Sequence, residues 1–227
     1  YGLRYLIRRP ADITFMKDML LDAGVESKLV VVIDNNDIDR EVTKYKPTHV
    51  IIEALWVVPT KFNILQKLHP KVKWIIRLHS EIPFLSNEGI AFDWIGDYLS
   101  FENIIIAVNG PRILHELRDL FSLKYQWTKK ESKDKIIYLP NYYPQVYKRR
   151  FFSHHRKHVN VSCFGAIRPM KNHLLQAIAA VDFANSVGKK LKFHINAGRV
   201  EQRGDTVLNN LKAFFEQIYD SGHRLII

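Results

Sequence analysis

Short apolar runs alternate with amphipathic stretches along most of the chain. The apolar runs LRYLI, KLVVVID, HVIIEALWV, VKWIIRLH, NIIIAVN and KIIYLPN have the length and β-branched content of strands, and the stretches between them carry apolar residues at helical spacing. Continuous apolar runs are typical of strands that are covered on both faces of a parallel sheet. The pattern therefore predicts an α/β fold whose first domain, residues 1–141, is a doubly wound, Rossmann-like layer with six parallel strands.

Several helix boundaries can be predicted from single residues. Asp12 is expected to cap the first helix and Gly24 to end it, and Pro111 stands where a helix begins. The buried face of the helix after Pro111 is expected to consist of Ile113, Leu114, Leu117, Leu120 and Phe121. The lysine-rich residues 122–135 are predicted to be a solvated excursion before the last strand of the first domain.

The periodicity stops at residues 142–158, where the run YYPQVYKRRFFSHHRKH contains many basic residues and no acid. This composition indicates an interdomain linker. The spacing of His154, His155 and His158 would allow a metal site, but without acidic or thiol partners the solvated linker is the favoured interpretation.

A second β/α series begins at residue 159. It comprises VNVSCFGAIRPMKN, a helix, LKFHINAGR, a second helix and HRLII. The buried face of its first helix is expected to contain Leu174, Ile178, Val181 and Ala184, with Gly188 behind the helix. Residues 159–227 are therefore predicted to be the first part of a second Rossmann-like domain that continues beyond Ile227, because two and a half units leave an unfinished core.

Composition and charge narrow the possible functions. The chain has 227 residues, of which 47% are hydrophobic and 25% are charged, so intrinsic disorder is excluded. The single cysteine, Cys163, excludes an internal disulfide and favours the cytoplasm, with peripheral attachment to the inner face of a membrane as a second possibility. No apolar run reaches the roughly 18 residues of a membrane-spanning helix. The net charge of +11 indicates an anionic partner, whether nucleic acid, a phospholipid surface or a phosphorylated small molecule.

Candidate site residues follow from a general rule for open parallel sheets, which bind ligands outside the carboxyl ends of their strands. In the second domain this rule selects residues 165–172 and residues 196–199. The first stretch lies in the string FGAIRPMKN, in which Gly165 allows close backbone approach, Arg168 and Lys171 supply two cations, and a helix opens near Asn172. A glycine, two cations and a helix N-terminus together form a suitable binding site for a diphosphate. The alternative interpretation is that both cations are solvated loop charges.

In the first domain the same rule selects residues 53–56, which begin with Glu53, residues 79–81 with His79 and Glu81, residues 109–110 with Asn109, and Asn141. His79 either contacts a ligand or is a polar strand-end residue, and Glu81 either acts as a base or pairs with His79 or Arg77. The two asparagines either contact a ligand or cap turns. Trp56 and Phe84 are expected to pack rather than to bind sugar. Asp37 and Asp39, in NNDID, are explained by helix capping, and no metal site is expected.

The string FGAIRPMKNHLLQAIAAV resembles the strand, loop and helix that open the C-terminal domain of retaining GT-B glycosyltransferases, especially family 4 (glycosyl transferases group 1). YLPNYYP is similar to the strand-to-linker signal of that family, LKFHINAGR to its next strand, and RLHSE to its acceptor-side histidine segment. The element order matches over nearly the whole chain. Two features depart from the family: Arg8, Arg9 and Pro10 replace a glycine-rich loop, and the family's paired glutamates would lie beyond Ile227.

The resemblance implies a two-domain GT-B architecture and assigns roles to individual residues. Arg168 and Lys171 would hold the donor diphosphate and stabilise the leaving nucleotide, with Gly165, Asn172 and Gly198 also on the donor side. His79 would lie near the reacting sugar, with Glu81 and Asn109 on the acceptor side. The implied reaction needs no metal and no cofactor beyond the nucleoside-diphosphate sugar.

Three functions are therefore open. The first is transfer from a nucleotide sugar, with retention, to an anionic acceptor that is either modified DNA or a membrane glycolipid. The second is non-catalytic nucleic-acid binding through residues 148–158, whose Phe151 and Phe152 would stack on bases. The third is a nucleotide-sugar epimerase or hydrolase of the same fold. Oligomeric state does not follow from any of these patterns.

Overall fold

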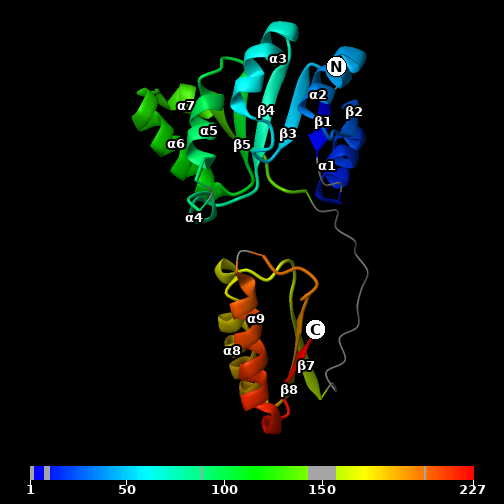
Figure 1. Ribbon diagram of the computed structural model, residues 1–227, viewed down its shortest axis with the longest axis vertical. Helices are drawn as coiled ribbons and strands as arrows, with labels where there is room; N and C mark the ends of the chain where they lie inside the picture. The colour runs from blue at the N-terminus through cyan, green and yellow to red at the C-terminus, as the bar shows by residue number, and fades with distance from the viewer. Residues whose placement is uncertain (1–2, 8–10, 88, 143–156, 202) are drawn as a thin grey trace. The chain divides into compact units, whose positions relative to one another are not determined.

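The computed structural model describes residues 3–7, 11–87, 89–142, 157–201 and 203–227 (Figure 1). The chain divides into two compact units, residues 1–146 and 147–227. The division falls within the predicted linker, residues 142–158. Residues 143–156 lie outside the described part of the chain, as does the Arg8–Pro10 segment, so His154, His155 and the predicted base-stacking residues Phe151 and Phe152 are not described. His158 is described and is the first residue of a strand, so the predicted linker extends one residue too far.

The first unit is built on a six-stranded parallel sheet with the strand order β2-β1-β3-β4-β5-β6. The strands are β1 (Leu3–Ile7), β2 (Ser27–Val31), β3 (His49–Glu53), β4 (Lys73–Leu78), β5 (Ile104–Val108) and β6 (Ile136–Tyr138). The connecting helices are α1 (Ala11–Asp22), α2 (Asn35–Tyr45), the 3-10 turn η1 (Pro59–Lys61), α3 (Phe62–Leu68), α4 (Ile82–Leu85), α5 (Ala91–Leu99), α6 (Pro111–Tyr125) and α7 (Lys129–Lys135).

The two faces of this sheet are covered unequally. On one face, α2, α3, α5 and α6 enclose the larger core, in which Phe62 packs edge-on against Trp74 and Tyr98. On the other face, Met16 of α1 lies in a smaller core with Ile51 and Ile75. Strands β3 and β4 are buried almost throughout, which confirms the doubly covered layer that their apolar runs predict.

The chain reverses direction across the sheet between β1 and β3. It begins in β1, moves outward to β2, and returns past β1 to β3 before it adds β4, β5 and β6 in sequence. In open α/β sheets the crevice beside such a reversal, at the carboxyl ends of the strands, is the usual ligand site. Glu53, the last residue of β3, lies at this edge.

The second unit contains the three-stranded parallel sheet β7-β8-β9. Its elements are β7 (His158–Cys163), the 3-10 turn η2 (Pro169–Lys171), α8 (His173–Ser186), β8 (Lys190–Ile195), α9 (Gly204–Gln217), the 3-10 turn η3 (Tyr219–Ser221) and β9 (Arg224–Ile226). Helices α8 and α9 lie side by side on one face of the sheet (Figure 1). They cover its apolar core, in which Leu191, Phe193 and Phe215 are buried.

The predicted helix ends are largely confirmed. Gly24 and Gly188 have φ angles of 75° and 64° just behind α1 and α8, a left-handed conformation that favours glycine, and α6 begins at Pro111. Asp12, however, is not the cap of α1, because that helix already begins at Ala11.

Other sequence predictions about helices and their buried faces are only partly confirmed. The predicted excursion over residues 122–135 is the end of α6 followed by α7, which a capping box between Thr128 and Glu131 initiates. Of the predicted buried faces, Ile113, Leu114, Leu117, Phe121 and Ala184 are buried as expected, whereas Leu120 and Ile178 are 43% and 44% exposed. Helix α8 buries Ala177 and Ala180 beside Ala184. In β8, buried and partly exposed residues alternate, because the helices cover one face of this sheet.

Candidate functional site

A buried ion pair lies at the carboxyl end of the first sheet. Glu53 of β3 and Arg77 of β4 occupy paired positions on neighbouring strands. Their relative exposures are 4% and 1%. Two charges removed from water to this extent need each other as partners and need hydrogen bonds for their remaining polar atoms. The strand register therefore places an acid beside a base inside the sheet.

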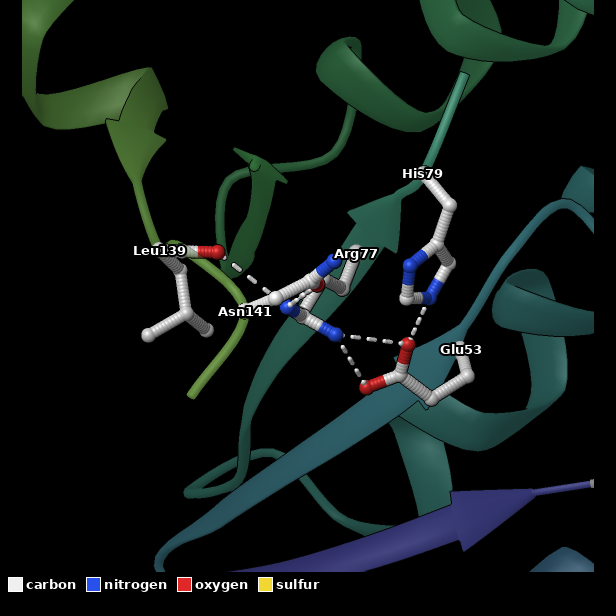
Figure 2. Close-up of polar contacts among 5 residues, drawn as sticks. All are labelled: Glu53, Arg77, His79, Leu139 and Asn141. Carbon is white, nitrogen blue, oxygen red and sulfur yellow. Dashed lines mark hydrogen bonds and ion pairs between the residues drawn. The ribbon is translucent and has the colours of Figure 1, made fainter. Parts of the chain in front are cut away.

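The Arg77 guanidinium donates hydrogen bonds both to Glu53 and to the segment that follows β6 (Figure 2). Its Nη1 donates to both carboxylate oxygens of Glu53, at 3.1 Å each. Its Nε donates to the Leu139 carbonyl oxygen at 3.2 Å, and its Nη2 donates to Asn141 Oδ1 at 2.5 Å. Arg77 thus ties the carboxyl ends of β3 and β4 to the chain that leaves β6. We call Glu53, Arg77, His79, Leu139 and Asn141 the Glu53 cluster.

A small residue on β5 fits this arrangement. Arg77 and Ala107 are partners on adjacent strands, and Ala107 pairs in turn with Ile137 of β6. Ala107 is fully buried. A methyl side chain at this position leaves room for the long Arg77 side chain to pass β5 and reach Leu139 and Asn141.

His79 is the part of the Glu53 cluster that meets solvent. It follows β4 directly, and its side chain is 32% exposed, whereas the Glu53 side chain that it contacts is 5% exposed. The imidazole Nε2 forms a hydrogen bond with Glu53 Oε2 (Figure 2). Glu53 is therefore shared between a buried cation and a half-buried imidazole that a ligand at this edge can reach.

The turn that follows Glu53 has an unusual backbone. Ala54 has a φ angle of 61°, in the left-handed region that non-glycine residues rarely adopt, and its N–H donates to the Arg77 carbonyl oxygen at 2.8 Å. Trp56, two residues later, is 54% exposed, so the prediction that it packs is wrong.

The other residues predicted for the first unit are only partly brought together. Asn141 joins the Glu53 cluster as a partner of Arg77, whereas Glu81 does not. A Cβ on Gly110 would lie 2.6 Å from Glu81 Oε1, so the Glu81 carboxylate lies beside the N-cap of α6. Of the two interpretations of Glu81, the pairing with His79 or Arg77 is wrong, because Glu53 is the partner of both. Asn109 is half-buried behind β5.

In the second unit, the loop between β7 and α8 holds a lysine over a glycine. Gly165 has a φ angle of 93°, and a Cβ there would collide with Lys171 Nζ. The Lys171 ammonium also donates to the Phe164 carbonyl oxygen, at 3.5 Å. Gly165 therefore provides both the left-handed turn and the space for the ammonium group. The lysine thus lies close to the backbone where β7 ends.

Arg168 lies in the same loop but has a protein partner. Arg168 and Arg199 both form ion pairs with Glu201, and the Arg168 and Glu201 side chains are 23% and 27% exposed. Burial alone would raise the pKa of the Glu201 carboxyl, but the hydrogen bonds from Arg199 and Arg168 lower this pKa overall. We call these three residues the Glu201 cluster. Together with Lys171, it brings three cations and one carboxylate to this sheet edge.

The loop packs against the start of α9. The Ile167 N–H donates to the Arg199 carbonyl oxygen at 2.9 Å, and the Glu201 N–H donates to the Ile167 carbonyl oxygen at 3.0 Å. Gly204 begins α9, and a Cβ there would collide with the Ile167 carbonyl group. The absence of a side chain at Gly204 therefore lets the loop that carries Arg168 and Lys171 sit on this helix end.

The remaining predicted donor-side residues lie at the same edge. Asn172 has a φ angle of 52° at the N-cap of α8, and its side chain makes no capping hydrogen bond. The next residue, His173, is fully buried, and burial together with nearby Lys171 lowers its pKa. Gly198 is exposed, and its N–H donates to Asn196 Oδ1 at 3.1 Å, so it forms an Asx turn.

Among the described residues, no group of three or more histidine, cysteine, aspartate or glutamate side chains could hold a metal ion. Asp37 completes the capping box of α2 with Asp34, as expected, whereas Asp39 contacts His69. Within the same described ranges, no helix has the length and apolar character to cross a membrane.

Comparisons with known proteins assign no family to the chain. No protein-family model matches it. No curated protein matches it. Among solved structures, it is similar to a D-isomer specific 2-hydroxyacid dehydrogenase from Lactobacillus delbrueckii ssp. bulgaricus in its NAD-complexed form, with 13% sequence identity and a TM-score of 0.31. The similarity covers 89% of this chain and 58% of that chain, so this chain spans somewhat more than half the length of the dehydrogenase.

The sequence analysis selected Glu53 by its place at the sheet edge but did not pair it with Arg77, and it missed Glu201. For the pairing of Glu53 with Arg77 a signal existed, because each is a single charged residue in an apolar strand run, and such charges are rarely buried without a partner. Glu201 lies beyond β8 in an irregular segment, where no pattern in the sequence pointed to it.

Proposed function

We propose that this chain is part of a GT-B glycosyltransferase that uses a nucleoside-diphosphate sugar, retains configuration and needs no metal. In this proposal the second unit binds the donor and the first unit presents the acceptor side. The observation that carries the proposal is the Lys171 ammonium, held over the left-handed Gly165 at the carboxyl end of β7 and just before α8. A lysine, a bare backbone and a helix start are what a diphosphate binds.

The charge at this loop supports an anionic ligand. Arg168, Lys171 and Arg199 outnumber the single carboxylate of Glu201, so the loop keeps an excess of positive charge. When a nucleoside diphosphate leaves a sugar, negative charge develops on its phosphate oxygens. Cations that are already in place stabilise that transition state more than the ground state. Lys171 would interact with the diphosphate directly, and Arg168 would do so while it shares Glu201 with Arg199.

The proposed roles in the first unit belong to His79 and its surroundings. His79 would orient a hydroxyl of the donor sugar or of the acceptor, because its half-exposed ring lies at the carboxyl edge beside the strand reversal. Trp56, which is 54% exposed, lies in the turn behind β3 at the same edge. Glu81 and Asn109 remain acceptor-side candidates that follow neighbouring strands.

Donor binding can be tested by calorimetry and thermal shift with a panel of nucleoside diphosphates and nucleotide sugars. We expect the wild type to be stabilised by nucleotides that carry one particular nucleobase. Lys171→Ala should weaken the binding of that nucleoside diphosphate about 10- to 100-fold, because a hydrogen bond to a charged group contributes about 1.5–3 kcal/mol. Lys212→Ala is the matched control, because this exposed lysine lies in α9 outside the loop. Equal binding by wild type and Lys171→Ala would refute the assigned role.

The reaction can then be followed with the donor that binds. Sugar transfer to an added acceptor is expected, whereas donor turnover without any acceptor would indicate an epimerase or hydrolase. The net charge of +11 is compatible with two anionic acceptors, modified DNA and a membrane glycolipid. Binding to duplex DNA that weakens steeply with salt would support the first, and recruitment to anionic vesicles would support the second.

A further inference from the structure

The contact between His79 and Glu53 determines which imidazole nitrogen of His79 carries the hydrogen in the neutral ring and which one is left bare. A carboxylate only accepts hydrogen bonds, so the Nε2 that faces Glu53 Oε2 must carry a hydrogen. In the neutral ring the other nitrogen, Nδ1, is then an acceptor. No hydrogen bond to Nδ1 is found within the described residues. The contact thus leaves Nδ1 as the nitrogen of His79 that can take up or release a proton.

Glu53 can play this part because it is itself held in place. Arg77 Nη1 lies 3.1 Å from each of its two oxygens, and Arg77 is anchored in turn by Leu139 and Asn141. Both side chains are buried, so neither carboxylate oxygen can turn toward water. A buried and doubly bonded carboxylate leaves its histidine partner little freedom to flip or to change tautomer.

We propose that Glu53 is a positioning residue that fixes His79 as the Nε2–H tautomer and makes Nδ1 the reactive nitrogen at this sheet edge. Arg77 contributes by holding Glu53 in place, and Asn141 contributes by holding Arg77. The tautomer follows from the Glu53 cluster alone and does not depend on the ligand. Its use in sugar transfer, where Nδ1 would accept a hydrogen bond from a hydroxyl group, rests on the proposed function.

The tautomer can be measured directly on the full chain. Nitrogen-15 NMR of histidine-labelled protein at alkaline pH distinguishes a protonated ring nitrogen from a bare one, and the His79 signal is identified by its loss in His79→Gln. We expect Nε2 to be protonated and Nδ1 bare in the wild type. An Nδ1–H tautomer, or an equal mixture of the two, would overturn the proposal. This result needs no variant of Glu53.

Glu53→Gln sharpens the test. Arg77 has only donors to offer, so the single oxygen of the glutamine should turn toward it, and the amide NH2 should face His79. The NH2 donates to a bare Nε2, so the neutral ring should change to the Nδ1–H tautomer. A His79 that keeps Nε2–H in folded Glu53→Gln would show that another group sets the tautomer, and would also overturn the proposal.

A second histidine provides the matched control. His69 Nε2 lies 2.8 Å from Asp39 Oδ1, the same kind of contact, and the Asp39 side chain is 43% exposed. Asp39→Asn should leave the His79 signals unchanged. In Glu53→Gln the His69 signals should match those of the wild type, which would show that the variant is folded. With an active donor, Glu53→Gln should lower kcat by a larger factor than it raises the donor KM. If the tautomer is as proposed but no nucleotide binds, the positioning role stands and the proposed function fails.

Discussion

The two polar clusters occupy equivalent places, at the carboxyl ends of parallel strands, but they differ in burial. In the Glu53 cluster the ion pair lies inside a sheet that is covered on both faces. In the Glu201 cluster the side chains of Arg168 and Glu201 are about a quarter exposed and that of Arg199 is 47% exposed, on a loop beside a sheet whose helices lie on one face. The comparison suggests that a buried pair is suited to fixing the geometry of a neighbour, whereas an exposed pair can share its cations with an incoming anion.

The largest expected difference between the clusters is in stability. Arg77→Met leaves the Glu53 carboxylate buried without its cation and should lower the free energy of unfolding by about 3–5 kcal/mol. Arg168→Met removes a partly exposed pair and should lower it by about 1 kcal/mol or less. Urea denaturation of both variants measures the contrast. The double variant Glu53→Met with Arg77→Met should recover most of the loss, and a loss as large as in Arg77→Met would contradict the buried-charge explanation.

A smaller effect is expected at Gly165. Gly165→Ala forces a side chain into a left-handed conformation and should lower the free energy of unfolding by about 1–2 kcal/mol. It also displaces the Lys171 ammonium, so affinity for the nucleoside diphosphate should fall as it does in Lys171→Ala. Calorimetry measures the affinity and denaturation the stability. Gly89→Ala is a control, because nothing lies within 4 Å of a Cβ there; unchanged nucleotide binding in Gly165→Ala would argue against the lysine site.

Glu201→Gln should change binding more than stability. The carboxylate competes with a bound anion for Arg168 and Arg199, so its neutralisation should raise the affinity for inorganic pyrophosphate several-fold. Titration calorimetry at low salt checks this, and the gain should shrink as salt is added. A fall in affinity would mean that Glu201 is needed to aim the arginines rather than to compete with the ligand.

The smallest effect concerns acid pH. Because the pKa of Glu201 is lower in the folded chain than its ordinary value of 4.5, its ion pairs stabilise the fold above that pH. This contribution should disappear as the pH falls below 4.5 and through the folded value. The small difference in melting temperature between wild type and Glu201→Gln should therefore vanish at the acid end of a pH series. A difference that grows in acid would have the wrong sign for this linkage.

Much of the fold follows from local pattern. The apolar runs marked the strands, Pro111 marked a helix start, and Gly24 and Gly188 marked two helix ends, because each of these signals acts within a few residues. The rule that parallel sheets bind ligands at their carboxyl edges was enough to select His79, Arg168 and Lys171. The residues chosen from the sequence thus lie at the predicted edges, although the two-domain enzyme itself remains a proposal.

The sequence by itself determined the order of the elements and the edges at which polar residues gather. Only the tertiary structure decided which of those residues meet. Glu53 and Arg77 are 24 positions apart, and strand register alone makes them neighbours, while the small Ala107 lets Arg77 reach Asn141. Likewise, Glu201 takes Arg168 as its partner because the loop packs on Gly204. Periodicity along a chain records the burial of single positions, whereas a pair of charges depends on distances between segments that no local pattern contains.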